Sequence, residues 1–510
     1  MVVAVVWFHN SLRIHDNPVL SWAYETENVD SILPIFIFDE EIQQKSTRTM
    51  GEQRLRFQFD CVDNLHRNLK DKLDLELHVF SGDSLDVLES IKQQLQSFEV
   101  ILLNEYSTNP RDRKQSELIE KNFISTNQNW SAKSLPASQT ILDIEAIVNS
   151  SGFKPPKSMK DMVQLFKTEF GDFDNIVFAT NDPNPSTGKP KQALLVNSEY
   201  QISLDKIRPL LTKPTYFLGG ESEAIARLEK KVISQQDYVN SFNKPKSIST
   251  NTKDNPMEPT TTGLSPYIST GCLSIRRLWN SCSKIQQSGE HTVPPVSLHG
   301  QILFREMFYL LSRSVENWDQ DSGNSQCKEI EWGELNQVQL DAWELGQTGF
   351  PFIDAMMRQL DATGWMHHLG RHAVSCFLTR GQLWQTWTHG RDIFERKLID
   401  SDWALNNGNW LWLAGVAPFS MPYYRIYNPC PDSKSSLNVE TKDAEFIRHW
   451  IPELAEFPSK HIFEPHLAPL HIQESAGCLI GRDYPNPIID RKEARKRNLQ
   501  SFKFSLEKLR

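Results

Sequence analysis

The segment VVAVVWF at residues 2–8 is a run of β-branched and aromatic residues with the length of a buried β-strand. Runs of the same kind recur as ILPIFIF at 32–38, ELHVF at 76–80 and VILLNE at 100–105. Residues 54–73 carry apolar side chains at the spacing of an amphipathic helix. Because strands that alternate with helices form parallel sheets, residues 1–130 are predicted to fold as a doubly wound α/β domain. No GxGxxG turn follows the first strand, so the fold alone assigns no ligand to this domain.

The rest of the chain has two parts that differ in polarity and in periodicity. Residues 131–225 are polar and contain turn-rich stretches such as NDPNPSTGKPK at 181–191, which predicts an interdomain linker. From residue 226 to 510, helical periodicity dominates once a Ser/Thr/Pro-rich loop at 247–263 has been passed. The second domain is therefore predicted to be all-α.

The composition is that of a water-soluble globular protein. The 510 residues are 39% hydrophobic, 10% aromatic and 23% charged, which suits two or three domains. No apolar run reaches the roughly 18 to 20 residues that a membrane helix needs, and no basic stretch precedes the apolar N-terminus. We therefore expect an intracellular protein without membrane contact. The seven cysteines form no CxxC pair, which favours reduced thiols over disulfides or a zinc site.

The balance of charge limits the partners. With 55 basic and 64 acidic residues the net charge is -9, so any contact with a polyanion has to be local. Residues 490–510 contain eight Lys or Arg and three acidic residues, which is either such a contact or a solvated terminal helix.

Two histidines have the spacing of one helix face. His368 and His372 are four residues apart in a helical pattern, with Arg371 between them. Two imidazoles on one face can transfer protons, although one can equally be a hydrogen-bonded core residue and the other a solvated one. The same spacing also suits zinc, but an HExxH motif needs Glu at position 369, which is Leu, and no third ligand is evident.

Three further patterns are candidates for a site. Asp400 and Asp402 lie among tryptophans, where an ionised carboxylate needs a partner; Arg371 is a candidate, and a surface pair near a helix end is the alternative. The segment 260–266 (TTTGLSP) precedes a helical pattern and can either bind a phosphate or only cap the helix. Six of the fourteen tryptophans lie between 365 and 412, a concentration that serves either core packing or electron hopping to a redox cofactor.

Together these motifs resemble the photolyase and cryptochrome family along nearly the whole chain. The segments that carry the resemblance are WFHNSLRIHDNPVL at 7–20, GGESEAIARL at 219–228, TTTGLSPYISTGCLSIRRLW at 260–279, GQILFREMFY at 300–309, residues 345–384, LIDSDWALNNGNWLW at 398–412 and CLIGRDYPNPIID at 478–490. The HHLGRHAV segment and the last of these motifs are most similar to 6-4 photolyases and animal cryptochromes.

The resemblance implies that the helical domain binds FAD. By position, residues that would hold the pyrophosphate are Lys244, Thr261, Thr262, Leu264 and Ser265, and residues that would line the cavity are Gln301, Arg305 and Glu306. Arg371 and Asp400 would form an ion pair against the flavin, Asp402 would meet its pyrimidine edge, and Asn406 would face N5. Asparagine at this last position is typical of photolyases and favours a flavin that stays fully reduced. An antenna chromophore, a deazaflavin or a folate, is a further implied ligand.

The implied activity is blue-light repair of pyrimidine(6-4)pyrimidone photoproducts in DNA. His368, as a cation, would be the proton donor and His372 its support. The tryptophans that match the photoreduction chain are Trp410, Trp387, Trp332 and Trp384. Arg425 would fill the gap left by the extruded bases and Lys154 would contact a phosphate.

An alternative within the family is a cryptochrome that acts as a photoreceptor or clock component through protein partners. The sequence lacks the long C-terminal tail with which cryptochromes often signal and retains both histidines, which favours repair. We expect a monomer located in the nucleus, with the plastid and the cytoplasm as alternatives.

Overall fold

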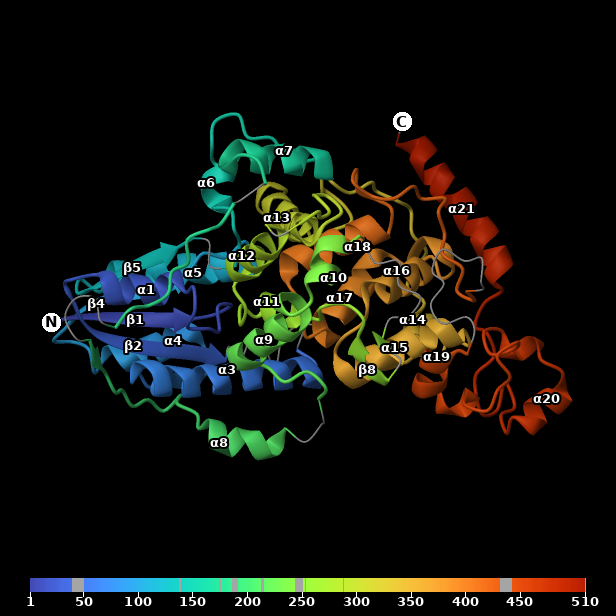
Figure 1. Cartoon of the computed structure of the whole chain (residues 1–510), viewed down its shortest axis with the longest axis horizontal. Coiled ribbons are helices and arrows are strands. Elements are labelled where there is room, and N and C mark those ends of the chain that lie inside the picture. The colour runs from blue at the N-terminus through green and yellow to red at the C-terminus, as the bar shows by residue number, and fades with distance from the viewer. Residues whose placement is uncertain are drawn as a thin grey trace. The chain divides into compact units, whose positions relative to one another are not determined.

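The protein is described by a computed structural model that covers residues 1–38, 50–136, 139–173, 176–185, 191–211, 215–243, 251–252, 254–287, 289–431 and 443–509 (Figure 1). The chain divides into two compact units. The sheet unit comprises residues 1–244 and 264–314, and the helical unit comprises residues 245–263 and 315–510. The domain limits expected near residues 130 and 225 stay predictions. No helix within the described ranges is both long and apolar enough to cross a membrane.

The sheet unit is built on a parallel sheet with the strand order β3-β2-β1-β4-β5, and β6 pairs with β2. Its strands are β1 (Val2–Phe8), β2 (Val29–Phe38), β3 (His78–Ser81), β4 (Glu99–Glu105), β5 (Trp130–Leu135) and β6 (Gln192–Ala193). The four apolar runs of the sequence coincide with β1 to β4. The predicted doubly wound parallel sheet is therefore confirmed.

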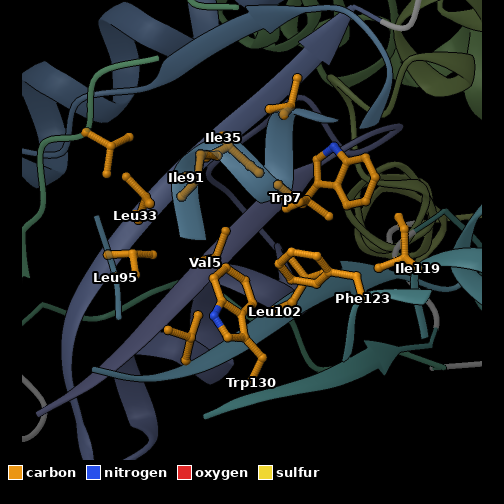
Figure 2. Close-up of a cluster of buried hydrophobic side chains, with 14 of the residues drawn as sticks. Val5, Trp7, Leu33, Ile35, Ile91, Leu95, Leu102, Ile119, Phe123 and Trp130 are labelled. Atoms are coloured by element: carbon orange, nitrogen blue, oxygen red, sulfur yellow. The ribbon is translucent and has the colours of Figure 1, made fainter. Parts of the chain in front are cut away.

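The sheet is apolar because both of its faces are covered. Along β1, Val3, Val5 and Trp7 point into one cluster of buried side chains, which Figure 2 shows together with residues of α4, α5 and β5. The intervening Ala4 and Val6 are also fully buried. A strand that is buried on both faces has no polar alternation, which is why these strands are visible in the sequence as continuous apolar runs.

β5 was not expected from the sequence. Its segment WSAKSL begins with the buried Trp130 and continues with mostly exposed residues. Among the described residues this strand pairs only with β4, at the edge of the sheet. An edge strand that faces solvent lacks the apolar run on which the prediction depended.

Helices and short turns complete the sheet unit. They are α1 (Pro18–Glu25), α3 (Glu52–Leu73), α4 (Ser84–Lys92), α5 (Pro110–Asn122), η1 (Ile124–Thr126), α6 (Ile144–Val148), α7 (Met159–Phe170), α8 (Leu204–Ile207), η2 (Arg208–Leu210), α9 (Glu221–Leu228), η3 (Glu229–Ile233), α10 (Gln236–Ser241), α11 (Ser265–Ser269), α12 (Ile275–Gln286) and α13 (Leu298–Ser314). Buried polar contacts join the segment between β1 and α1 to the region of α11 and α12. Arg13 donates to the carbonyl of Gly271 at 2.8 Å, and Arg276 pairs with Asp16 at 2.9 Å.

Helices make up the regular secondary structure described in the helical unit, as expected, apart from one described hairpin of β7 (Asn251–Thr252) with β8 (Asn255–Pro259). Its helices and turns are α14 (Gln337–Glu344), α15 (Pro351–Thr363), α16 (His368–Cys376), η4 (Phe377–Gly381), α17 (Trp387–Lys397), α18 (Trp403–Leu413), α19 (Glu445–Trp450), η5 (Pro452–Leu454), η6 (Pro465–Leu467), α20 (Leu470–Ser475) and α21 (Arg491–Lys508). η4 is a π-helical turn that directly continues α16. Such turns inside helices are frequent at functional sites.

Candidate active site

Three histidines lie at or near the beginning of α16. His367 is the N-cap residue, and its Nδ1 accepts a hydrogen bond from the backbone N–H of Leu369 at 3.2 Å. The ring centroids of His367 and His368 are 4.7 Å apart, and those of His368 and His372 are 5.6 Å apart. The structure therefore brings the two histidines singled out from their spacing close together on one helix, with a third imidazole beside them.

His372 is held by a residue that was not expected from the sequence. Its Nδ1 lies 2.9 Å from the hydroxyl oxygen of Tyr427, and the ring of Trp412 packs edge to face at a centroid distance of 4.7 Å. Tyr427 belongs to the irregular segment 421–431 that follows α18. Burial raises the pKa of Tyr427 to about 12, so its hydroxyl stays protonated at neutral pH.

The environment of both histidines opposes their protonation. Burial, with a smaller effect of the Arg371 guanidinium, lowers the pKa of His368 to about 4. Burial, then His368 and Arg380, lowers the pKa of His372 to about 3. In the protein without bound DNA these effects therefore disfavour the cationic His368 that the resemblance implies, and its role as proton donor stays a prediction. Desolvation and neighbouring cations both disfavour the imidazolium form, and neither could be read from the sequence.

The ion pair inferred for Asp400 is present. Nη2 of Arg371 donates to Oδ2 of Asp400 at 2.7 Å, and Nε of Arg371 donates to the carbonyl of Met366 at 2.9 Å. Asp400 is buried, whereas the Arg371 side chain is 22% exposed. The segment before α16 and the segment before α18 are thus joined by one guanidinium.

The first turn of α18 carries the other polar residues expected at a flavin. Asp402 is the N-cap residue and accepts a hydrogen bond from the backbone N–H of Leu405 at 2.9 Å, which explains why the helix begins at Trp403. The buried Asn406 amide donates from Nδ2 to the carbonyl of Arg391 on α17 at 3.0 Å. Asp402 and Asn406 lie one helical turn apart, so they are on the same side of α18.

α17 approaches α18 closely. A Cβ atom at Gly390 on α17 would overlap the indole ring of Trp410 on α18. Trp410 is fully buried, with ring contacts to Phe394 at 5.0 Å and Trp343 at 6.4 Å. A larger residue at position 390 would therefore displace the tryptophan that is expected to be nearest the flavin.

The remaining tryptophans of the expected electron-transfer chain fall into two places. Trp332 and Trp384 are in ring contact at 5.0 Å, and Phe502 of α21 packs against both. Trp387 is fully buried at the start of α17, where the Arg391 guanidinium lies 5.4 Å from its ring centroid. The structure thus pairs Trp332 with Trp384, and the role of all four tryptophans in electron transfer stays a prediction.

Several expected cofactor residues belong to the sheet unit. Leu264 is the N-cap residue of α11, which begins at Ser265. Gln301, Arg305 and Glu306 lie on α13. Thr261 and Thr262 fall in the helical unit, and Lys244 lies outside the described residues.

On α13, the structure shows what two of these residues contact within the sheet unit. The carboxylate of Glu306 accepts the backbone N–H groups of Ile141 and Leu142 at 3.0 and 3.1 Å, and burial raises its pKa to about 6. Arg305 donates to the hydroxyl of Tyr309 at 3.1 Å. The Glu306 contacts join α13 to the segment that precedes α6, whereas the Arg305 contact lies within α13.

Both residues expected at DNA are exposed. Lys154 is exposed in the sheet unit, and the Arg425 side chain is exposed in the 421–431 segment of the helical unit. The carbonyl of Arg425 accepts a hydrogen bond from Arg380 at 2.7 Å. Over the described ranges, no group of three or more His, Cys, Asp or Glu side chains is arranged to hold a metal ion.

Comparison with known proteins identifies the chain. Residues 297–504 match the FAD binding domain of DNA photolyase, and residues 4–182 match the DNA photolyase family. Over 504 residues, which are 95% of this chain and 85% of the relative, it is 35% identical to a (6-4)DNA photolyase of Arabidopsis thaliana. The chain belongs to the DNA photolyase and cryptochrome family. The resemblance inferred from the motifs is therefore confirmed.

Both branches of this family are represented among the relatives. A (6-4)DNA photolyase of Oryza sativa is 36% identical, covering 96% of this chain and 87% of its own, and Cryptochrome-1 of Rattus norvegicus is 32% identical, covering 98% and 82%. Among solved structures, a bacterial class III photolyase of Agrobacterium tumefaciens has a TM-score of 0.77 at 23% identity, with 99% of this chain and 98% of that chain covered. A Synechocystis cryptochrome has the same TM-score at 24% identity, with coverage of 98% and 99%. These two structures establish the shared fold.

FAD is the cofactor of the matched C-terminal domain, and the residues of the helical unit fit it. A flavin ring presents N–H and carbonyl groups along its pyrimidine edge and two flat apolar faces. The Arg371–Asp400 pair supplies a cation and a carboxylate, Asp402 a second carboxylate, and Asn406 a neutral amide. This set of donors and acceptors suits that edge.

Proposed function

We propose that this protein repairs pyrimidine(6-4)pyrimidone photoproducts in DNA under blue light. The observation that carries the proposal is the histidine pair. The ring centroids of His368 and His372 are 5.6 Å apart, and the hydroxyl of Tyr427 is hydrogen-bonded to the His372 ring. Two of the relatives are named (6-4)DNA photolyases. FAD, when bound in its reduced form, would supply light-driven electron donation to the lesion.

The task of the chain itself is to deliver a proton to the lesion before the electron returns. His368 is the donor in this proposal, because it lies at the beginning of α16 and is the partly exposed member of the pair, whereas His372 is buried. A neutral imidazole is a very weak acid, so His368 has to be protonated first. An anionic group that arrives beside it raises its pKa, and a phosphodiester of bound DNA is such a group.

His372 keeps the donor in place in this scheme. It is hydrogen-bonded to Tyr427, burial disfavours its protonated form, and its ring centroid lies 5.6 Å from that of His368. Nη2 of Arg371 lies 2.7 Å from Oδ2 of Asp400. Because the guanidinium is paired with this carboxylate, Arg371 contributes charge in this scheme and does not donate a proton. Arg425, exposed on the adjoining segment, is the proposed contact with the strand from which the damaged bases are extruded.

A second candidate function is that of a cryptochrome photoreceptor or clock component that acts through protein partners. Cryptochrome-1 of Rattus norvegicus is nearly as similar in sequence as the photolyases. The two functions differ in what light does: repair changes the DNA, whereas signalling changes the affinity for a partner.

The deciding experiment is a repair assay with the FAD-loaded protein under blue light. One oligonucleotide carries a single 6-4 photoproduct and a second carries a cyclobutane dimer, and each has a dark control. We expect light-dependent restoration of the first substrate alone. A protein that binds FAD and becomes photoreduced, yet restores neither substrate, would contradict the proposal and favour the cryptochrome function.

A further inference from the structure

Arg380 is a buried guanidinium in η4, the turn that continues the helix of the two histidines. Its side chain is 1% exposed. It donates four hydrogen bonds, from Nε to the carbonyl of Leu413 at 3.2 Å, from Nη1 to the carbonyls of Tyr423 at 3.0 Å and Arg425 at 2.7 Å, and from Nη2 to the sulfur of Met421 at 3.2 Å.

These partners are unusual for a buried cation. Three are backbone carbonyls and one is a thioether, so none of them carries a compensating charge. Only a planar fork with donors in several directions can reach the end of α18 and two points of the following segment at once, and lysine has no such geometry. Arg380 therefore fixes the path of the backbone between residues 421 and 425.

That path ends at the histidine pair. Tyr427 is two residues beyond Arg425, and its hydroxyl oxygen lies 2.9 Å from Nδ1 of His372. The helical segment α16–η4 is therefore hydrogen-bonded to the irregular segment in two places. Arg380 binds the carbonyls of Tyr423 and Arg425, and His372 binds the hydroxyl of Tyr427. If the Arg380 hydrogen bonds are lost, the geometry of the His372–Tyr427 hydrogen bond changes as well.

We propose that Arg380 is the positioning residue of the histidine pair: it holds the hydroxyl of Tyr427 against Nδ1 of His372 and thereby fixes which ring nitrogen of His372 carries the proton. A phenol is a stronger acid than a neutral imidazole, so the hydroxyl donates and Nδ1 accepts. The proton of the imidazole then resides on Nε2. The consequence for catalysis rests on the proposed repair function, whereas the tautomer does not.

The charge of Arg380 acts in the same direction. The titratable and charged groups that face His372 are His368 on its own helix, Arg380 on η4 and Tyr427 on the irregular segment, and the uncharged Trp412 packs from α18. Arg380 and His368 both lower the pKa of His372, so this ring accepts no proton from solvent near neutral pH. His372 can therefore act as a neutral relay with a defined N–H.

Three variants separate geometry from charge. Arg380→Lys keeps the positive charge but cannot bridge the three carbonyls, Tyr427→Phe removes only the hydroxyl, and the double variant combines both changes. The matched control is Arg358→Lys, because Arg358 on α15 also holds a loop, through the carbonyl of Gly346 at 3.1 Å and through Glu453 at 2.9 Å.

The first measurement needs no repair activity. Histidine ring ¹⁵N shifts of the FAD-loaded protein are recorded in the dark, with His372 assigned from the spectrum of His372→Asn. We expect a single Nε2–H tautomer in the wild-type protein and in Arg358→Lys, and a mixture of tautomers in Arg380→Lys and Tyr427→Phe. If the His372 shifts of Arg380→Lys equal those of the wild type, the proposal is overturned.

The second measurement is repair per absorbed photon at equal FAD occupancy. We expect a loss of about tenfold or more in Arg380→Lys and in Tyr427→Phe, since a small misplacement of a reacting group has effects of this size. The double variant should lose no more than Tyr427→Phe alone, because both changes break one linkage. Multiplied losses in the double variant would assign Arg380 to general stability instead. If the wild type repairs nothing, the proposed function fails, and the ¹⁵N measurement still decides the role of Arg380.

Discussion

Nη2 of Arg371 lies 2.7 Å from Oδ2 of Asp400, and this contact joins the helix of the histidines to the segment that leads into α18. Asp400 is 9% exposed, so its carboxylate depends on the guanidinium for compensation of its charge. The pair fixes the distance between two segments that carry the expected flavin contacts.

Asp400→Asn should therefore weaken both the fold and cofactor binding. Replacing the Asp400 carboxylate by an amide should cost about 2 kcal/mol in the free energy of unfolding, because it removes a hydrogen bond between charged groups at a carboxylate that is shielded from water. Urea unfolding followed by circular dichroism and FAD retention on dilution are the two measurements. The matched control is Glu453→Gln, which breaks the more exposed Arg358–Glu453 pair and should cost less than about 1 kcal/mol. Equal losses in both variants would contradict the importance of the buried pair.

His368→Ala should abolish repair while FAD stays bound. The side chain lies at the beginning of α16 and contacts the imidazoles on either side of it, so its removal takes away the proposed proton donor and little packing. Light-dependent repair is measured together with the flavin absorbance spectrum. The control is His449→Ala, because His449 is an exposed histidine whose ring contacts Trp450 edge to face. Repair that proceeds at the wild-type rate in His368→Ala would remove His368 from the mechanism.

The proximity of His368 and His372 and the pairing of Asp400 with Arg371 could be predicted from the sequence. Residues four apart in a helix lie on one face, and Asp400 needed a cation in an apolar stretch, which left few candidates. The strands β1 to β4 could also be predicted from local sequence. A strand that is buried on both faces is a continuous run of apolar residues.

Tyr427 and Arg380 could not be found in the same way. Each acts through a contact between segments whose approach depends on the path of the backbone after α18, and neither residue has a spacing that distinguishes it from other tyrosines and arginines. The effects that disfavour a cationic His368 could not be predicted for the same reason. Its low pKa arises from burial by several elements and from Arg371, and these add up only in the folded protein.

Lesion binding should be coupled to the uptake of a proton. The pKa of His368 is about 4 in the free protein, so it is neutral at pH 7, and it must rise when DNA binds if His368 is to act as an acid. The complex then holds one more proton than its separate components. Affinity consequently falls by up to about tenfold per pH unit as the pH rises from about 4 to the pKa of bound His368, and it is independent of this group at higher pH.

Titration calorimetry in the dark, in buffers of different ionisation enthalpy, measures this uptake directly. We expect about one proton per lesion at pH 6, and none for undamaged DNA or for His368→Asn. Proton uptake that persists in His368→Asn would assign the titrating group to another residue.

Trp410→Phe should stop the photoreduction of oxidised FAD and spare repair by chemically reduced enzyme. Trp410 is fully buried on α18 beside the expected flavin contacts, and phenylalanine fills most of its volume but is much harder to oxidise than indole. The loss of ring volume should cost about 1 to 3 kcal/mol in the free energy of unfolding, which leaves the protein folded.

The matched control is Trp343→Phe. Trp343 is equally buried, contacts Trp410 at 6.4 Å, and donates from Nε1 to the carbonyl of Val374 at 3.0 Å, so its replacement removes a hydrogen bond as well as volume but no expected electron donor. Flavin absorbance under blue light with an external reductant is the readout. If Trp343→Phe blocks photoreduction and Trp410→Phe does not, electrons reach the flavin by a route through Trp343, and the expected chain is wrong at its first step.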